Sequence, residues 1–196
     1  EFGAVLKGNS SLRSKMKIIT KCGIKMISSN RPKHHIKSYD SSKAHIIASV
    51  EASLKNLHTD YIDTILIHRP DVLINAQEVA ETVSVLKKEG KIKSFGVSNF
   101  TTHQVELLET FVKVEQHQVE ISTTNLSAFQ NGVLEQAQLK NIEIQSWSPL
   151  GNGIFDIKTA SHKRIIEVAE QLSFIHNTTI SSILLAFLYM HPANII

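Results

Sequence analysis

The sequence predicts an α/β fold in which a parallel sheet, covered by helices, closes as a (β/α)8 TIM barrel. Short apolar strand patterns alternate with amphipathic helix patterns from about residue 16 onward, and this alternation is typical of parallel strands joined by helices. The competing closure is an open doubly wound sheet, which usually carries a Gly-x-Gly-x-x-Gly turn after its first strand. No such turn is present, and the Gly-Asn-Gly at residues 151–153 is only a partial match after a late strand. The barrel is therefore favoured.

Composition and charge are those of an ordinary folded domain, so we expect one domain over residues 1–196. Hydrophobic residues make up 42% of the chain and the net charge is only +3, and a chain of this length can bury a sizeable core. No basic stripe with interleaved aromatic residues points to nucleic acid, and no apolar run approaches the roughly 20 residues that span a bilayer. The single cysteine, Cys22, indicates a reducing compartment. We therefore expect a cytoplasmic protein that binds neither nucleic acid nor membrane.

The order of the expected elements follows from hydrophobic periodicity and from turn residues. Strands are expected at 16–21, 61–68, 92–97, 116–120 and 142–147, and a sixth from residue 193. Helices are expected near 46–57, 76–89, 101–112, 133–137, 162–172 and 179–189. A polar loop is expected at 28–35, and Ser41 or Ser42 is expected to cap the helix that follows it.

Polar or aromatic side chains stand where the predicted strands end. In a (β/α) barrel the carboxyl ends of the strands carry the active site, because the βα loops converge there. Five successive strand ends of this kind are hard to explain by packing alone. The residues are Lys21, His68, Ser98, Asn99, Gln118, Trp147 and Ser148.

Ordinary structural interpretations compete with the functional ones at the first strand ends. Lys21 could lower the pKa of a neighbour or bind an anion, or it could simply reach solvent. His68 could be catalytic, or a buried histidine bonded to a backbone carbonyl. Ser98 and Asn99 could grip a planar carboxamide, or either could cap the next helix.

The later strand ends leave similar alternatives open. The side-chain amide of Gln118 could likewise bind a planar carboxamide, because each group offers both a hydrogen-bond donor and an acceptor. Trp147 could stack on a ring or fill the core, and the loop from Ser148 to residue 153 could hold a pyrophosphate or be a common turn. The pair His34-His35 lacks partners at metal-site spacing, so no metal site is expected.

The motifs resemble those of the aldo-keto reductase family, and most of all its bacterial general oxidoreductases. The matching segments occur in the family's order, and the resemblance is strongest between residues 52 and 153. They are ILIHRP at 65–70, GKIKSFGVSNF at 90–100, QVE at 118–120 and WSPLG at 147–151.

The resemblance implies a role for each matching residue. Lys21 matches the active-site lysine and His68 the active-site histidine. The residues that hold the nicotinamide carboxamide are matched by Ser98, Asn99 and Gln118. Trp147 matches the aromatic residue that stacks on the nicotinamide ring. The loop along the cofactor pyrophosphate is matched by Ser148 and Leu150.

The chain departs from the family pattern at both ends. The family uses an aspartate and a tyrosine that precede the lysine strand, and residues 1–15 contain neither. The segment for the adenosine phosphate would begin beyond Ile196. The resemblance therefore predicts an incomplete barrel, about strands 3 to 7 and the start of strand 8, truncated at both ends and inactive by itself.

The function that the resemblance implies is NAD(P)H-dependent reduction of an aldehyde or ketone by hydride transfer. It favours NADPH over NADH and a small carbonyl compound as substrate, while the substrate itself and the oligomeric state cannot be read from the sequence. Two alternatives remain open. One is a barrel protein that binds the cofactor without catalysis, and the other is a barrel enzyme in which Lys21 forms a Schiff base.

Overall fold

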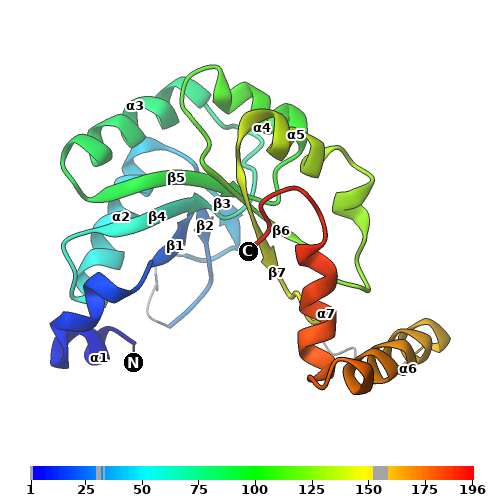
Figure 1. The fold of residues 1–196 in the computed structure, drawn as a ribbon. Coiled ribbons are helices and arrows are strands. Elements are labelled where there is room, and N and C mark those ends of the chain that lie inside the picture. Colours follow the sequence, from blue (N-terminus) through cyan, green and yellow to red (C-terminus); the bar gives the residue numbers. More distant parts are fainter. Residues whose placement is uncertain (1, 30–31, 33, 152–158) are drawn as a thin grey trace. The chain divides into compact units, whose positions relative to one another are not determined.

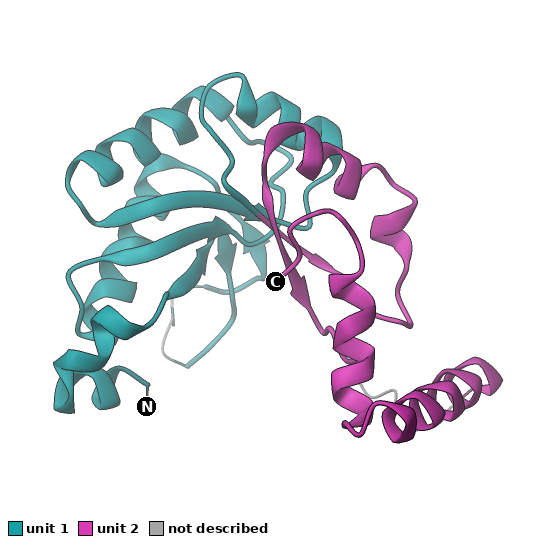
Figure 2. Cartoon of the chain, in the orientation of Figure 1, with its two compact units in different colours: residues 1–116 teal, residues 117–196 magenta. Residues whose placement is uncertain are grey.

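The computed structural model describes residues 2–29, 32, 34–151 and 159–196. The chain divides into two compact units, Glu1–Gln116 and His117–Ile196, which are coloured teal and magenta in Figure 2. The prediction of one domain over residues 1–196 stays a prediction.

Unit 1 is built on three neighbouring parallel strands of the main sheet (Figure 1). Its elements in chain order are α1 (Phe2–Gly8), the 3₁₀ helix η1 (Ser10–Lys15), β1 (Ile19–Cys22), β2 (Ile24–Lys25), β3 (Ser38–Tyr39), α2 (Lys43–Leu57), β4 (Ile62–Ile67), α3 (Ala76–Lys88), β5 (Ile92–Ser98) and α4 (Thr102–Glu109). The sheet order is β1, β4, β5, and both pairs are parallel. Helix α2 packs against β1 and α3 against β5. Strands β2 and β3 form a separate antiparallel pair.

The core of unit 1 centres on β4, because this strand is buried on both faces. Ile62, Ile65, Leu66 and Ile67 are almost completely inaccessible to solvent. A continuous apolar run of this kind is typical of a parallel strand covered on both sides by other elements. The observed sheet therefore confirms the predicted α/β class.

Side-chain caps set where the helices of unit 1 begin. The Ser42 side chain accepts a hydrogen bond from the His45 amide at the start of α2, so Ser42 rather than Ser41 is the cap. Thr101 and Gln104 form a capping box at the start of α4. The alternative that Ser98 or Asn99 caps this helix is therefore wrong.

The amino ends of the strands in unit 1 are held by a charged cluster around Asp63. This carboxylate accepts hydrogen bonds from Arg13 Nη2 at 2.7 Å, from Lys93 Nζ at 3.1 Å and from the Ile18 amide at 2.9 Å. The Arg13 guanidinium and the Lys93 ammonium also lie 3.7 and 3.9 Å from the centre of the Tyr61 ring. The cluster ties η1 to β4 at the end of the sheet opposite the predicted site.

Unit 2 contains the rest of the strand–helix alternation. Its elements are β6 (Gln116–Glu120), which begins at the last residue of unit 1, η2 (Ser127–Phe129), α5 (Val133–Lys140), β7 (Glu143–Trp147), α6 (Ala160–Ile175) and α7 (Ile180–Tyr189). Strand β6 neighbours β7. Ile144 forms a parallel bridge with Ile195, and the Ser146 amide donates to the Ile196 carbonyl at 2.8 Å. The expected sixth strand therefore begins at the end of the described chain.

Two details of unit 1 differ from the sequence expectations. The first strand begins at Ile19 rather than at residue 16, and the sequence did not predict β2 and β3. A two-residue strand is too short to show a hydrophobic period. The predicted loop at 28–35 does lie between these short strands, although residues 30, 31 and 33 are outside the described part of the chain.

Length and composition also allow a test for membrane-spanning helices. No single helix among the described residues is long and apolar enough to cross a bilayer. Helices α6 and α7 meet the criterion only when taken together, and they are bent by 98° at the break between them.

His117 in unit 2 predicts a loss of stability in acid. Its side chain is 1% exposed, its Nε2 has no hydrogen-bond partner among the described residues, and burial lowers its pKa to about 4. As the pH falls from about 6.5 to 4, His117 becomes protonated in the unfolded chain but stays largely neutral in the folded chain. The free energy of unfolding therefore drops by about 3 kcal/mol. We expect His117→Leu to remove most of this drop.

The measurement is urea unfolding at several pH values within that window. His103→Leu is the matched control, because His103 is exposed on α4 and its replacement should leave the pH dependence unchanged. If His117→Leu and the unmodified protein lose the same free energy between pH 6.5 and 4, the buried neutral histidine is not the cause.

Candidate active site

The three parallel strands of unit 1 bring Lys21 and His68 to the same edge of the sheet. Lys21 lies on β1 and is in register with Leu66 on β4. His68 directly follows β4, and its amide donates to the carbonyl of Cys22 at 2.9 Å. Both side chains are half-buried. The sequence placed the two residues at strand ends, and the strand register puts them on neighbouring strands.

The environment of His68 favours the neutral imidazole. Burial lowers the pKa of His68 from its ordinary value of 6.5, and nearby positive charges lower it further. These charges, in decreasing order of effect, are Lys21, Arg69 and Lys37. Burial also lowers the pKa of Lys21. A neutral histidine beside a lysine can donate a hydrogen bond to an oxygen on which negative charge develops, while the ammonium stabilises that charge.

Ser98 and Asn99 end the next strand of the same sheet. Ile67 is in register with Val97, so His68 and Ser98 are the next residues on adjacent strands. Asn99 has a φ of 59°, in the left-handed region that asparagine tolerates better than most residues. Its Nδ2 donates to Ser98 Oγ at 2.8 Å. This bond fixes the direction of the Asn99 amide at the edge that carries Lys21 and His68.

In unit 2, Gln118 lies in the middle of β6 rather than at its end. Its Nε2 donates to Oε1 of Gln145 on β7 at 3.1 Å. Trp147 is the last residue of β7 and is only partly buried. This partial exposure fits a stacking surface better than a side chain that fills the core.

The turn after β7 contains the last two residues of the predicted site. Ser148 has a φ of 51°, and its carbonyl accepts from the Gly151 amide at 2.9 Å. Leu150 packs against a buried cluster of Ile166, Ala169 and Leu184 on α6 and α7. The turn is therefore attached to these helices. The rest of the proposed pyrophosphate loop, including residues 152 and 153, lies outside the described residues.

A cavity of about 290 Å³ lies in unit 1 between the segment before α2 and the loop after β4. Ser41 donates to Asp71 Oδ2 through its amide and its hydroxyl, at 2.9 and 3.0 Å, and the Lys43 amide donates to Glu78 Oε1 at 2.9 Å. Two of the carboxylates that line the cavity, those of Asp71 and Glu78, thus accept hydrogen bonds from the segment before α2 and from its first residue. The sequence did not predict it, because these partners are at least 30 residues apart. The lining residues are Tyr39, Asp40, Ser41, Ser42, Asp71, Leu73, Asn75 and Glu78.

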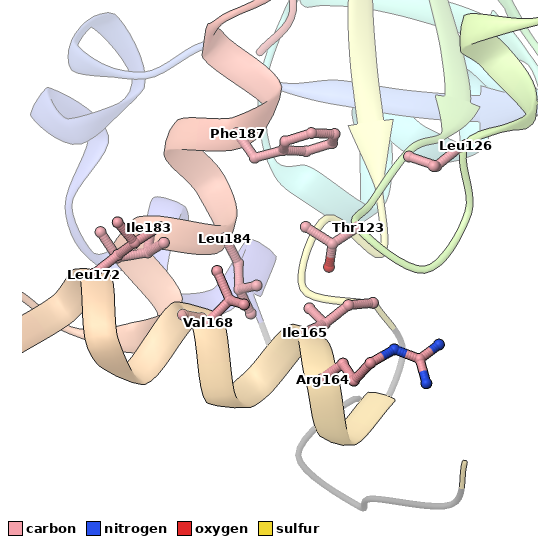
Figure 3. Close-up of a pocket in the computed structure, with 10 residues that line it drawn as sticks. Thr123, Leu126, Arg164, Ile165, Val168, Leu172, Ile183, Leu184 and Phe187 are labelled. Atoms are coloured by element: carbon pink, nitrogen blue, oxygen red, sulfur yellow. The ribbon is translucent and has the colours of Figure 1, made fainter. Parts of the chain in front are cut away.

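An apolar groove of about 400 Å³ lies within unit 2 (Figure 3). Helices α6 and α7 line it together with Thr123 and Leu126, which precede η2. Phe187 and Val168 are among its apolar walls, and Arg164 is the one charged residue among the described residues that line it. None of the eight predicted site residues lines this groove. The described residues also contain no group of three His, Cys, Asp or Glu side chains able to hold a metal ion.

Comparison with known proteins gives the family of the chain. The model of the aldo/keto reductase family matches residues 1–196. The uncharacterized oxidoreductase YcsN of Bacillus subtilis is 42% identical over 99% of the chain, and the 6-dehydroglucose reductase of Agrobacterium fabrum is 35% identical over 100% of it. The chain spans 66% of the length of each of these relatives.

Solved structures of related proteins share this fold, in agreement with the predicted incomplete (β/α)8 barrel. The thermostable aldo-keto reductase Tm1743, crystallised with the inhibitor epalrestat, has a TM-score of 0.80 and 26% identity, with 100% of this chain and 64% of that chain covered. The glycerol dehydrogenase of Gluconobacter oxydans has a TM-score of 0.79 at 21% identity, over 94% of this chain and 62% of that one, and supports the fold alone. The family match over the whole chain and these likenesses lead to one conclusion: the chain belongs to the aldo/keto reductase family.

Proposed function

We propose that the protein is an NADPH-dependent oxidoreductase that reduces the carbonyl group of a small aldehyde or ketone. The observation that carries this proposal is the placement of Lys21 and His68 on neighbouring strands, with the pKa of His68 lowered by burial and by Lys21. A neutral hydrogen-bond donor beside a cation suits an oxygen that gains negative charge during the reaction. Membership of the aldo/keto reductase family supports the same chemistry.

The residues available for the cofactor suit a nicotinamide nucleotide. A carboxamide offers one acceptor and one donor group, and the side chains of Ser98, Asn99 and Gln118 supply matching groups. In the proposal these three residues hold the carboxamide, Trp147 stacks on the ring, and Ser148 and Leu150 contribute to the pyrophosphate loop. The bound cofactor would supply the hydride.

The residues of this chain would act on the substrate oxygen. His68 would orient the carbonyl by donating a hydrogen bond to its oxygen, and Lys21 would stabilise the negative charge that develops there. The family resemblance also implies a tyrosine as proton donor before the lysine strand, and residues 1–15 do not contain one. In the complete protein such a tyrosine would protonate the oxygen, and Lys21, as a nearby cation, would lower the pKa of that tyrosine.

The relatives suggest which aldehydes to test first. Two proteins named 6-dehydroglucose reductase, from Agrobacterium fabrum and Novosphingobium aromaticivorans, are 35% and 33% identical to the chain. The cavity in unit 1 is lined by several oxygen-bearing side chains, including Ser41 and Asn75. Sugar-derived aldehydes, which carry many hydroxyl groups, are accordingly the first substrates for the assay.

The test uses the complete protein with NADPH or NADH and a panel of aldehydes that includes sugar aldehydes. We expect consumption of NADPH, at a higher kcat/KM than that of NADH. Tight NADPH binding without turnover on any aldehyde would support the non-catalytic alternative instead. Borohydride trapping of an aldehyde on Lys21 would support the Schiff-base alternative.

A further inference from the structure

Gln145 is a buried amide that the proposed mechanism does not use. It lies on β7 within unit 2, two residues before Trp147, and is 4% exposed. Its side chain is therefore withdrawn from solvent. A glutamine in such surroundings loses its hydration, which costs about 1–3 kcal/mol unless its polar atoms find partners. The contact that its carbonyl makes therefore indicates what the residue does.

That contact is the hydrogen bond from Gln118. Gln118 Nε2 donates to Gln145 Oε1 at 3.1 Å across the adjacent strands β6 and β7. Gln118 is only partly buried, whereas Gln145 is inaccessible. The bond thus connects a partly exposed side chain to a buried one.

The direction of this bond fixes the amide of Gln118. A glutamine amide has two orientations that exchange its donor and acceptor ends, and its hydrogen-bond partners decide between them. With Nε2 committed to Gln145, the acceptor Oε1 occupies the other end of the Gln118 amide. No described residue donates a hydrogen bond to this Oε1. Gln118 therefore presents an acceptor to a ligand.

We propose that Gln145 is a positioning residue for the cofactor: it holds Gln118 so that Gln118 Oε1 accepts a hydrogen bond from the N–H₂ group of the nicotinamide carboxamide. This inference rests on the proposed function and adds a residue to it. Buried groups that orient a ligand-binding side chain influence affinity without touching the ligand. An apolar residue at position 145 leaves the Gln118 amide free to turn and to present its donor end.

The experiment compares two cofactors in the complete protein. One is NADP⁺, and the other is its 3-acetylpyridine analogue, in which a methyl group replaces the N–H₂ group. Since the analogue cannot donate to Gln118 Oε1, we expect the unmodified protein to bind NADP⁺ about tenfold more tightly, the effect of a hydrogen bond worth about 1.4 kcal/mol.

Gln145→Met tests the positioning role, because methionine has a similar volume and no acceptor of comparable strength. We expect this variant to lose the tenfold preference. Gln145→Glu keeps a carboxylate oxygen as acceptor and should retain the preference, which provides a second variant if the methionine variant folds poorly. Gln136→Met is the matched control. It makes the same replacement at another buried glutamine of unit 2, on α5, and should keep the full preference.

Each outcome decides a separate point. If the unmodified protein binds both cofactors equally, or if Gln145→Met keeps the preference, the positioning role is overturned while the proposed function stands. If Gln136→Met loses the preference as well, the effect is one of general packing and the inference is also overturned. If the unmodified protein binds neither cofactor, the proposed function itself is wrong and the inference falls with it.

Discussion

Gly96→Ala is expected to abolish folding, or to lower the free energy of unfolding by more than about 3 kcal/mol. A Cβ atom at this position in β5 would lie 2.3 Å from the carbonyl oxygen of Gln116 and 2.7 Å from Cδ2 of Leu66. The Leu66 side chain can move, but the Gln116 oxygen belongs to the backbone and cannot move without displacing its segment. The close approach of the Gln116 backbone to β5 therefore requires a glycine at position 96.

Soluble yield and urea unfolding of the complete protein measure this effect. Gly8→Ala is the matched control, because a Cβ at Gly8 meets nothing within 4 Å and alanine favours a helix more than glycine does. We expect this control to be neutral or slightly stabilising. If Gly96→Ala unfolds at the same urea concentration as the unmodified protein, the Gln116 backbone does not lie as close to position 96 as described.

The elements with a long apolar period could be predicted from the sequence. The apolar run that ends at His68 and Pro70 located β4, and the pattern from Ile92 to Val97 located β5 almost to the residue. In parallel strands such runs are a direct consequence of burial on both faces. The placement of Lys21 and His68 followed from the same signal, because position along a strand fixes the end at which a residue lies.

The cap of α4 could have been predicted from the sequence, which left capping by Ser98 or Asn99 as one of two alternatives. Thr101 followed by Gln104 is a capping-box pattern, and the structure shows both of its hydrogen bonds. Ser98 and Asn99 stand where the predicted strand meets the helix, so both are also possible caps by residue type. The structure places Ser98 within β5 at 1% exposure. The structure therefore contradicts the interpretation of Ser98 and Asn99 as helix caps.

Contacts between residues that are distant in the chain could not be predicted from the sequence. The period of two along a strand places Gln145 on the same face as Trp147. The partner of Gln145, however, depends on the register between β6 and β7, which no local pattern reports. The stacking of Arg13 on Tyr61 likewise joins residues 48 positions apart. Contacts between side chains so far apart in the sequence depend on the tertiary packing, which a local sequence pattern does not report.

The largest effect on activity is expected from Lys21→Met. Under the proposed function, removal of this cation should lower turnover by about 10²–10³-fold, the usual effect of losing one group that stabilises an oxyanion. NADPH affinity should change little, because the assigned cofactor residues are Ser98, Asn99, Gln118, Trp147, Ser148 and Leu150. The measurement is kcat for a reactive aldehyde together with the Kd of NADPH, in the complete protein.

The same variant should move the pKa of His68. Because the Lys21 charge lowers this pKa, its removal raises the value, but burial is the larger cause and keeps it below 6.5. An NMR titration of the His68 ring measures the shift. Lys17→Met is the matched control, since Lys17 precedes β1 at the other end of the strand and should alter neither turnover nor the titration. Unchanged turnover in Lys21→Met would refute the catalytic role, whereas an unchanged His68 titration would show that the two side chains do not share one site.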